Sequence, residues 1–287
     1  MRNKLIASVF EHMLFRDVSQ HVRGIRTRLG LPAHGPDVLS STLSPFLYMH
    51  PSTPAFEYPR SDLAPQVHFI GPLLPRPSLD FEPPVWWNDL HSGKQVVLVN
   101  QGTVATELND LIVPTLQALA GDDLLVIATT GGATAAELGI GIPANARVEP
   151  FVPFAELLPH IDLMITNGGY GGVQFALAQG IPLIVAGTTE DKPEVAARVA
   201  WSGAGMNLRT KTPTPEQIRA AVQSVRRNAQ YSLNAERIRA DYARHNAPHE
   251  AARLLEQLAA SKQPVPRTEL PERSARHAGH GTTGELA

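Results

Sequence analysis

The residues with the clearest potential for chemistry form a glycine-rich loop, NGGYGG, at positions 167–172. Four glycines in six positions leave backbone N–H groups unshielded by side chains, at a point where a helix is expected to begin. The first amides of a helix and the positive end of its dipole attract anions, most often a phosphate. The spacing matches neither the Walker A loop nor the G-x-G-x-x-G pattern. A glycine-rich surface turn without a ligand is therefore the alternative interpretation.

The elements around this loop predict a parallel α/β sheet. Apolar runs at 163–166 and 181–186 are typical of buried strands, and a short helix over 173–179 is expected between them, ended by Gly180. Such a sheet binds ligands at the carboxyl ends of its strands. Further strands are expected at 96–99, 124–128 and 147–150. A helix is expected over 108–119, with Pro114 either kinking it or marking its true start.

Composition excludes several classes of function. The net charge of −2 gives no reason to expect nucleic acid or an anionic membrane as a partner, and the absence of cysteine excludes disulfides and Cys-based metal sites. No apolar run approaches the ~20 residues that span a bilayer. The first 15 residues are interrupted by charges and predict an amphipathic helix rather than a signal peptide, so a cytoplasmic location is expected.

Four phrases, in order along the chain, carry a resemblance to a known family: TNGGYGGVQ, GIPLIVAG, EDKPEVAARV and GAG. Together they resemble the donor-binding signature of family 1, UDP-glycosyltransferase-like enzymes, especially the bacterial macrolide-type branch. The resemblance covers about residues 96–260. It implies a GT-B fold, in which two Rossmann-like domains face each other across a cleft and the C-terminal domain binds a nucleotide-diphosphate sugar.

The expected fold class is therefore α/β, with a Rossmann-like parallel sheet, a partial N-terminal acceptor domain and a disordered C-terminal tail. Residues 1–75 are assigned to a remnant of the acceptor domain, 76–94 to a linker, 95–260 to the nucleotide-sugar donor-binding domain and 261–287 to the tail. A full member of the family has one domain of roughly 150–200 residues before the linker. The chain is thus expected to be truncated at its N-terminus.

The resemblance implies a set of donor-binding residues. The diphosphate would be bound by Thr103, Asn167, Gly168, Gly169, Gly171 and Gly172. The base would be bound by Phe151 and Val152, and the sugar by Asp191 and Lys192. The ring at position 151 would stack on the base, and backbone groups of the next residue would contact the base edge. Three alternatives stay open: a common Gly-Thr turn at 103, a core phenylalanine at 151, and a favourable first-turn charge at 191.

Four positions depart from the family pattern. Asn167 stands where most members have histidine, and its amide can still donate a hydrogen bond, although not a charge-assisted one. Gly172 replaces a common serine. Phe175 replaces the glutamate that holds the ribose in many members, so that ribose contact is not expected. Lys192 replaces glutamine, which changes an amide to a cation.

The reaction implied is the transfer of a hexose from a UDP- or dTDP-sugar to a small hydrophobic hydroxyl acceptor, with inversion. Helix amides would stabilise the leaving diphosphate without a metal, so no cofactor is expected. In the family the general base is a histidine in a Gly-His phrase of the N-terminal domain. The chain has no counterpart, since His280 follows Gly279 within the tail. No catalytic residue is named.

Two other functions stay open. The chain could be a donor subunit completed by a separate acceptor subunit, as in two-subunit N-acetylglucosaminyltransferases, or a non-catalytic nucleotide-sugar-binding module. Expected partners are the nucleotide-diphosphate sugar, a small-molecule acceptor and a protein supplying the missing acceptor domain. A dehydrogenase is disfavoured, because no acidic residue ends a second strand at the ribose position.

Overall fold

The computed structural model describes residues 15–32, 43–102 and 107–267, which divide into two compact units. The first unit holds the described residues up to Tyr48, residues 63–68 and those from 254 onward. The second unit holds residues 49–62 and 69–253. The segment 49–62, which the sequence analysis assigned to an acceptor-domain remnant, thus packs with the parallel sheet of the second unit.

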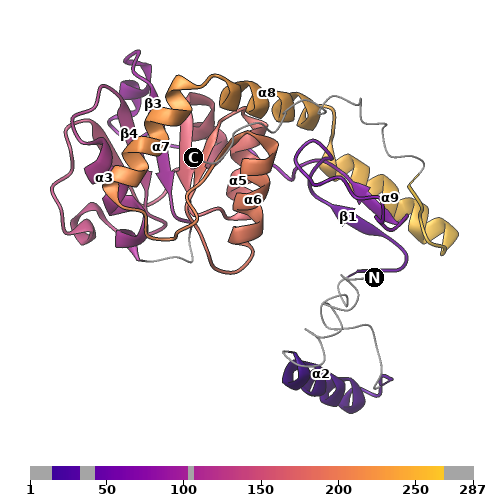
Figure 1. Ribbon diagram of the computed structural model, residues 1–287. Coiled ribbons are helices and arrows are strands. Elements are labelled where there is room, and N and C mark those ends of the chain that lie inside the picture. The colour runs from indigo at the N-terminus through magenta and orange to yellow at the C-terminus, as the bar shows by residue number, and fades with distance from the viewer. Residues whose placement is uncertain (1–14, 33–42, 103–106, 268–287) are drawn as a thin grey trace, which may run out of the picture. The chain divides into compact units, whose positions relative to one another are not determined.

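A six-stranded sheet, parallel at every pairing, forms the centre of the second unit (Figure 1). The strand order is β5-β4-β3-β6-β7-β8. The strands are β3 (Val96–Asn100), β4 (Leu125–Thr129), β5 (Ala146–Glu149), β6 (Leu163–Thr166), β7 (Leu183–Val185) and β8 (Gly205–Asn207). Their near-continuous apolar sequences follow from burial on both faces, because helices cover each side of a parallel sheet.

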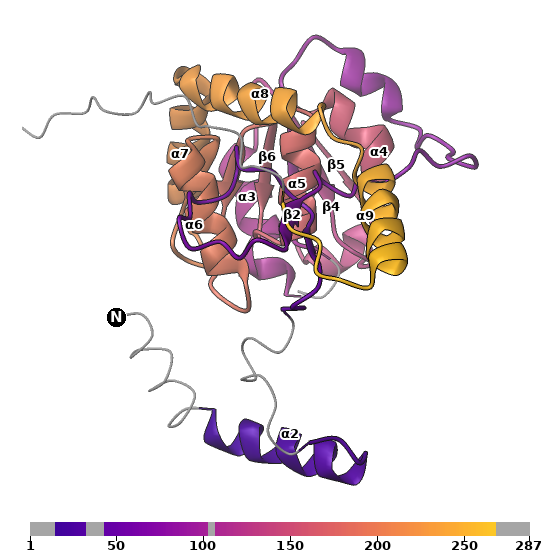
Figure 2. The same cartoon turned by 90° about the vertical axis from the view of Figure 1, so that its right-hand side faces the viewer.

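Helices form one layer on each face of this sheet, as Figures 1 and 2 show. One face carries α3 (Ile112–Leu119) and α7 (Pro215–Arg227), and the other carries α5 (Tyr170–Ala178), α6 (Lys192–Ser202) and α8 (Gln230–Tyr242). Alternate strand residues serve the two layers: Val97 packs toward the first pair of helices and Leu98 toward the others.

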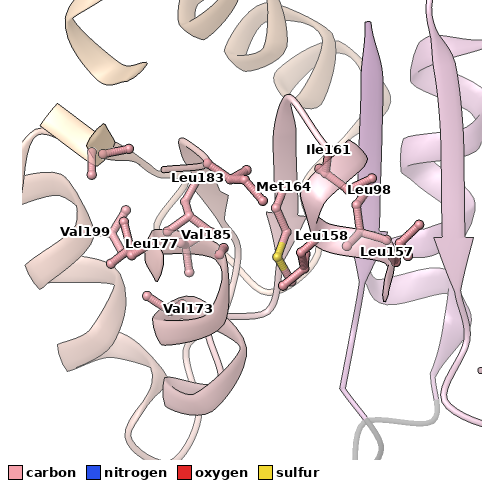
Figure 3. Packing of buried hydrophobic residues seen from close by; sticks show 14 of the residues in the cluster. Leu98, Leu157, Leu158, Ile161, Met164, Val173, Leu177, Leu183, Val185 and Val199 are labelled. Atoms are coloured by element: carbon pink, nitrogen blue, oxygen red, sulfur yellow. The ribbon is translucent and has the colours of Figure 1, made fainter. Parts of the chain in front are cut away.

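Apolar side chains of α5 and α6 fill the space above β6 and β7. Figure 3 shows Leu177 and Val199 directed toward Leu183 and Val185, and all four residues are fully buried. Burying such side chains stabilises the fold by about 1.5–3 kcal/mol each. This packing fixes α5, and with it the glycine loop that precedes the helix.

The strand predictions are confirmed to within a few residues, and two helices differ from expectation. The helix α3 begins at Ile112, after a short 3₁₀ helix (Leu108–Asp110), so Pro114 lies in its first turn, close to the start of the helix. The helix α5 begins at Tyr170 rather than at 173, because tertiary packing overrides the low helix propensity of the paired glycines that follow.

The segment around the 3₁₀ helix η2 (Trp87–His91) is hydrogen-bonded to side chains of β5, an edge strand of the sheet. The indole N–H of Trp86 donates to Glu149 Oε1 at 2.7 Å, and Arg147 donates through two nitrogens to Asp89 Oδ2, each at 2.7 Å. Part of the predicted linker 76–94 is therefore attached to the edge strand of the sheet.

The remaining elements are short or belong partly to the first unit. They are α2 (Arg16–Arg28), β1 (Tyr48–His50), β2 (Val67–Phe69), η4 (Ala135–Leu138), α4 (Phe154–Leu157), η5 (Leu158–His160) and α9 (Ala247–Ser261). Strands β1 and β2 pair in a two-stranded sheet. Among the described residues, no helix has both the length and the apolar character that a membrane span requires.

The first part of the predicted tail is packed within the first unit. The Val265 N–H donates to Phe46 O at 2.9 Å, the Arg267 N–H donates to Pro65 O at 2.7 Å, and the Val265 side chain is 2% exposed. The rest of the predicted tail, residues 268–287, lies outside the described residues.

Candidate functional site

The direction of strand order reverses between β3 and β6. From β3 the chain proceeds through β4 to β5 on one side, then returns to place β6 on the other side of β3. At such a reversal the loops after the two strands diverge and leave a crevice at their carboxyl ends. Here the two loops are joined by Asn167, whose side-chain amide donates to Gln101 O.

A pocket of about 380 Å³ lies at this reversal. Loops that follow β3, β6 and β7, together with residues beside α3 and after β8, form its wall. The lining residues are Gln101, Gly102, Asp110, Leu111, Asn167, Gly169, Ala186, Gly187, Thr189, Glu190, Asp191, Lys192 and Lys211. Four predicted donor-binding residues are therefore gathered around one cavity: Asn167, Gly169, Asp191 and Lys192.

The amino-terminal end of α5 stands beside this pocket without a side-chain cap. Asn167 Oδ1 accepts the N–H of Gly169 at 3.3 Å, and the first intrahelical bond runs from Val173 N–H to Gly169 O at 3.1 Å. The N–H groups of residues 170–172 precede that bond, so the helix leaves them without an intrahelical acceptor. Gly168 turns the chain with φ +86°, which its lack of a Cβ permits.

Charges of both signs line the pocket. The Lys192 ammonium pairs with Glu190, and its side chain is 12% exposed. Lys211 Nζ lies 3.4 Å from Asp110 Oδ2. Asp191 is exposed at the N-cap position of α6, where its side chain makes no capping hydrogen bond. The site therefore presents two lysines, each paired with a carboxylate, and the exposed carboxylate of Asp191 near a set of backbone donors.

A model of one protein family matches residues 114–258, about half of the 287-residue chain. The family is described as "Erythromycin biosynthesis protein CIII-like, C-terminal domain". The chain belongs to this family. The match includes β4 to β8 and every described pocket residue from Asn167 to Lys211, so the EryCIII-like domain holds most of the candidate site.

Curated relatives of this EryCIII-like chain are named as glycosyltransferases or as a synthase. The 4'-demethylrebeccamycin synthase of Lentzea aerocolonigenes is 44% identical over 259 residues, which is 90% of this chain and 61% of that protein. UDP-glucosyltransferase 1 of Beauveria bassiana (strain ARSEF 2860) is 41% identical over 206 residues, which is 70% of this chain and 44% of that protein. The chain thus spans about half of the length of these relatives.

Solved structures of the same kind share the fold. The glycotransferase of kitacinnamycin superposes with a TM-score of 0.70 at 21% identity, covering 89% of this chain and 65% of its own. The calicheamicin glycosyltransferase CalG4 gives a TM-score of 0.68 at 22% identity, covering 85% and 60%. These likenesses confirm the predicted α/β, Rossmann-like fold of GT-B glycosyltransferases.

The other predicted site residues that the structure describes are not among the residues that line the pocket. Phe151 is 70% exposed at the carboxyl end of β5, so the alternative of a core phenylalanine is excluded. The Val152 side chain is 3% exposed and packs in the core. Gly168 is not a lining residue, and Gly171 and Gly172 lie in the first turn of α5. Thr103 lies outside the described residues.

Several pocket residues were missed by sequence reasoning. Gly187 directly follows the predicted strand 181–186, so its place at a strand's carboxyl end was a usable signal. Asp110 and Lys211 offered no such signal, because they are 101 positions apart and meet through the fold. Phe175 packs edge-on against Phe154 with ring centroids 6.2 Å apart.

Within the described residues, no group of three or more His, Cys, Asp or Glu side chains could hold a metal ion.

A second polar cluster, the Glu57 network, lies within the same unit. The Glu57 side chain is 10% exposed, and its carboxylate accepts hydrogen bonds from Tyr170 Oη at 2.9 Å and from Arg198 Nε at 2.8 Å, while His50 Nε2 lies 3.3 Å away. Burial raises the pKa of Glu57. The effect of burial is outweighed by hydrogen bonds from His50 and Tyr170 and by the charges of His50 and Arg198. Together these lower the pKa of Glu57 to about 2.

This pKa predicts a pH-dependent contribution to stability. Because the folded pKa of Glu57 lies below the ordinary value of 4.5, the contribution is fully present above about pH 4.5 and is lost as the pH falls toward 2. The loss is up to about 3 kcal/mol in the free energy of unfolding. Urea unfolding at a series of pH values between 6 and 2.5 measures it. If Glu57→Gln leaves the slope of stability against pH unchanged, the assignment to Glu57 is wrong.

Proposed function

We propose that this chain carries the nucleotide-sugar donor site of a glycosyltransferase, which transfers a hexose from a UDP- or dTDP-sugar to a hydroxyl acceptor. Membership of the EryCIII-like family and the names of relatives support this proposal. One solved relative of the fold, the glycosyltransferase VinC, 25% identical with a TM-score of 0.55, is described as a complex with DTDP.

The observation that carries the proposal is the place of the pocket. A 380 Å³ cavity at the strand-order reversal, beside an uncapped helix start, combines backbone donors with the positive end of a helix dipole. A diphosphate needs such donors, since it carries concentrated negative charge. Lys192 and Lys211 also line the pocket, each paired with a carboxylate, Glu190 or Asp110.

Each group of residues has a distinct part in the proposed chemistry. The amides of residues 170–172 and the Asn167 side chain bind the diphosphate, and they stabilise it as a leaving group without a metal. Asp191 and Lys192 bind the sugar hydroxyls. Phe151 stacks on the base from its exposed position, and the backbone at Val152 contacts the base edge. Thr103 is proposed for the diphosphate as well.

Transfer by this route inverts the anomeric centre. An acceptor hydroxyl attacks the anomeric carbon while the bond to the diphosphate breaks, and a general base takes the hydroxyl proton. We assign the acceptor to small hydrophobic molecules and the base to a part of the enzyme outside the candidate donor site. A separate protein supplying the acceptor side is the partner that this arrangement accommodates.

Calorimetric titration of the purified chain with UDP, UDP-glucose and dTDP-glucose tests the proposal. The wild-type chain should bind at least one of them. Gly169→Val should weaken binding more than about tenfold, because it adds three carbons to the pocket wall. Asp191→Ala should weaken the binding of UDP-glucose but not that of UDP, since only UDP-glucose carries the sugar that Asp191 contacts in the proposed site.

A glycine outside the site provides the control. A Cβ at Gly141 meets no atom within 4 Å, so Gly141→Val should leave the affinities unchanged. If the wild-type chain binds none of the three nucleotides, the proposed function is wrong. Equal losses of nucleotide affinity in Gly141→Val and Gly169→Val would show that the pocket is not the nucleotide site.

A further inference from the structure

The segment 49–62 is built into the second unit more deeply than its irregular backbone suggests. Four of its residues, Ser52, Thr53, Phe56 and Glu57, are 7% exposed or less, and Phe56 belongs to the core beneath α5 and α6. A buried segment of this kind must satisfy its polar groups within the protein. The Glu57 carboxylate does so through residues on both neighbouring helices.

The two oxygens of Glu57 bind different elements. Oε1 accepts from Tyr170, the first residue of α5, and Oε2 accepts from Arg198 in α6. A second tie runs from Gln174 Nε2 of α5 to Pro51 O at 3.3 Å. The segment 49–62 is therefore hydrogen-bonded to the helix that begins at the pocket.

Tyr170 connects this network to the candidate donor site. Its backbone directly follows Gly169, which lines the pocket, and it opens the turn whose amides stand without intrahelical acceptors. The neighbouring glycines lose more conformational freedom on ordering than other residues do. With no side-chain cap on α5, the phenol of Tyr170 is the side chain within 167–172 that anchors the turn to a buried, charged group.

We propose that Glu57 is a positioning residue for the nucleotide site: through Tyr170 it holds the glycine turn where the free amides of α5 face the pocket. The expected consequence, tighter binding of a diphosphate, rests on the proposed function. The segment before the predicted linker thereby supports the donor site, although none of its residues lines the pocket.

A solely structural role for the network is the competing explanation, because breaking a buried ion pair destabilises most proteins. Two variants separate the explanations. Tyr170→Phe removes the hydroxyl that donates to Glu57. Tyr242→Phe makes the same change in α8, where the hydroxyl donates to Gln174, one turn further along α5 and away from the pocket. Both remove one buried hydroxyl that bonds within the same layer.

Two measurements are made on the wild-type chain and on Tyr170→Phe, Glu57→Gln and Tyr242→Phe. The first is hydrogen exchange of the Val173 amide, whose bond to Gly169 O closes the glycine turn. The second is the dissociation constant for UDP or dTDP. Exchange at Val173 should accelerate about tenfold in Tyr170→Phe and Glu57→Gln, and nucleotide affinity should fall by a similar factor. Tyr242→Phe should change neither by more than about twofold.

The outcomes separate this proposal from the proposed function. If Val173 exchange and nucleotide affinity are the same in Tyr170→Phe as in Tyr242→Phe, the network is structural and the positioning role is wrong. If the wild-type chain binds no nucleotide, the proposed function fails, while Val173 exchange still decides whether Glu57 positions the turn. The proposal is supported if exchange at Val173 is faster in Tyr170→Phe but unchanged in Tyr242→Phe.

Discussion

Gly187→Ala should abolish measurable nucleotide binding, with a loss of affinity of at least about 100-fold. A Cβ at this position would stand 2.0 Å from Asn167 O and 3.1 Å from Lys192 Cβ. Neither neighbour can yield without moving the backbone of the glycine loop or the start of α6. Because both segments line the pocket, the substitution displaces proposed phosphate and sugar contacts together.

Gly205→Ala is the matched control for this variant. A Cβ at Gly205 would stand 2.0 Å from Leu183 O, so the clash is of the same severity, but it lies between β7 and β8 and outside the pocket wall. Both variants should lose stability by about 1–3 kcal/mol or more. The wild-type chain and both variants are compared by urea unfolding and by calorimetric titration with UDP and dTDP. Retained nucleotide binding in Gly187→Ala would contradict the proposed site.

Glu57→Ala should lower the free energy of unfolding by about 3–5 kcal/mol, the range typical for removing one partner of a buried ion pair. The substitution removes the carboxylate 2.8 Å from the Arg198 guanidinium, which is 23% exposed, and leaves it with the more exposed Glu194 carboxylate at 3.4 Å. It also removes the acceptor of the Tyr170 hydroxyl. Because native domains are stable by only about 5–15 kcal/mol, this loss is a large part of the total.

An exposed ion pair in the same segment provides the comparison. Arg60 and Asp62 lie 3.0 Å apart, with side chains 58% and 76% exposed. Asp62→Ala should lower the free energy of unfolding far less than Glu57→Ala does, since solvent screens such exposed pairs. Chemical denaturation at pH 7 measures both variants. Equal losses would show that burial of Glu57 does not govern its contribution.

Local sequence was enough to predict the elements near the glycine loop. The strand at 163–166 has the bounds of β6, and Gly180 follows the end of α5 with φ +74°. At the start of α7, Thr214 and Gln217 form a capping box and Pro215 is the first residue of the helix. In each case the signal lies within a few residues, where apolar runs and capping groups act directly on the backbone.

The family resemblance rested on phrases that the fold places around one end of the sheet. NGGYGG and EDKPEVAARV both contribute residues to the pocket wall, namely Asn167, Gly169, Glu190, Asp191 and Lys192. These residues follow two neighbouring strands, so their convergence follows from parallel pairing of β6 with β7.

Tertiary structure alone decided which distant residues meet. Residue spacing does not reveal that Asp110 pairs with Lys211, 101 positions later, or that Glu57 accepts from Tyr170, 113 positions later. The phrase FEYPR was expected in an acceptor-domain remnant, yet its phenylalanine and glutamate are buried in the unit that holds the sheet. Strand order and the burial of charge depend on contacts summed over the whole chain. A local pattern therefore fixes the strand, loop and helix, whereas the partners of each side chain emerge only when the sheet is assembled.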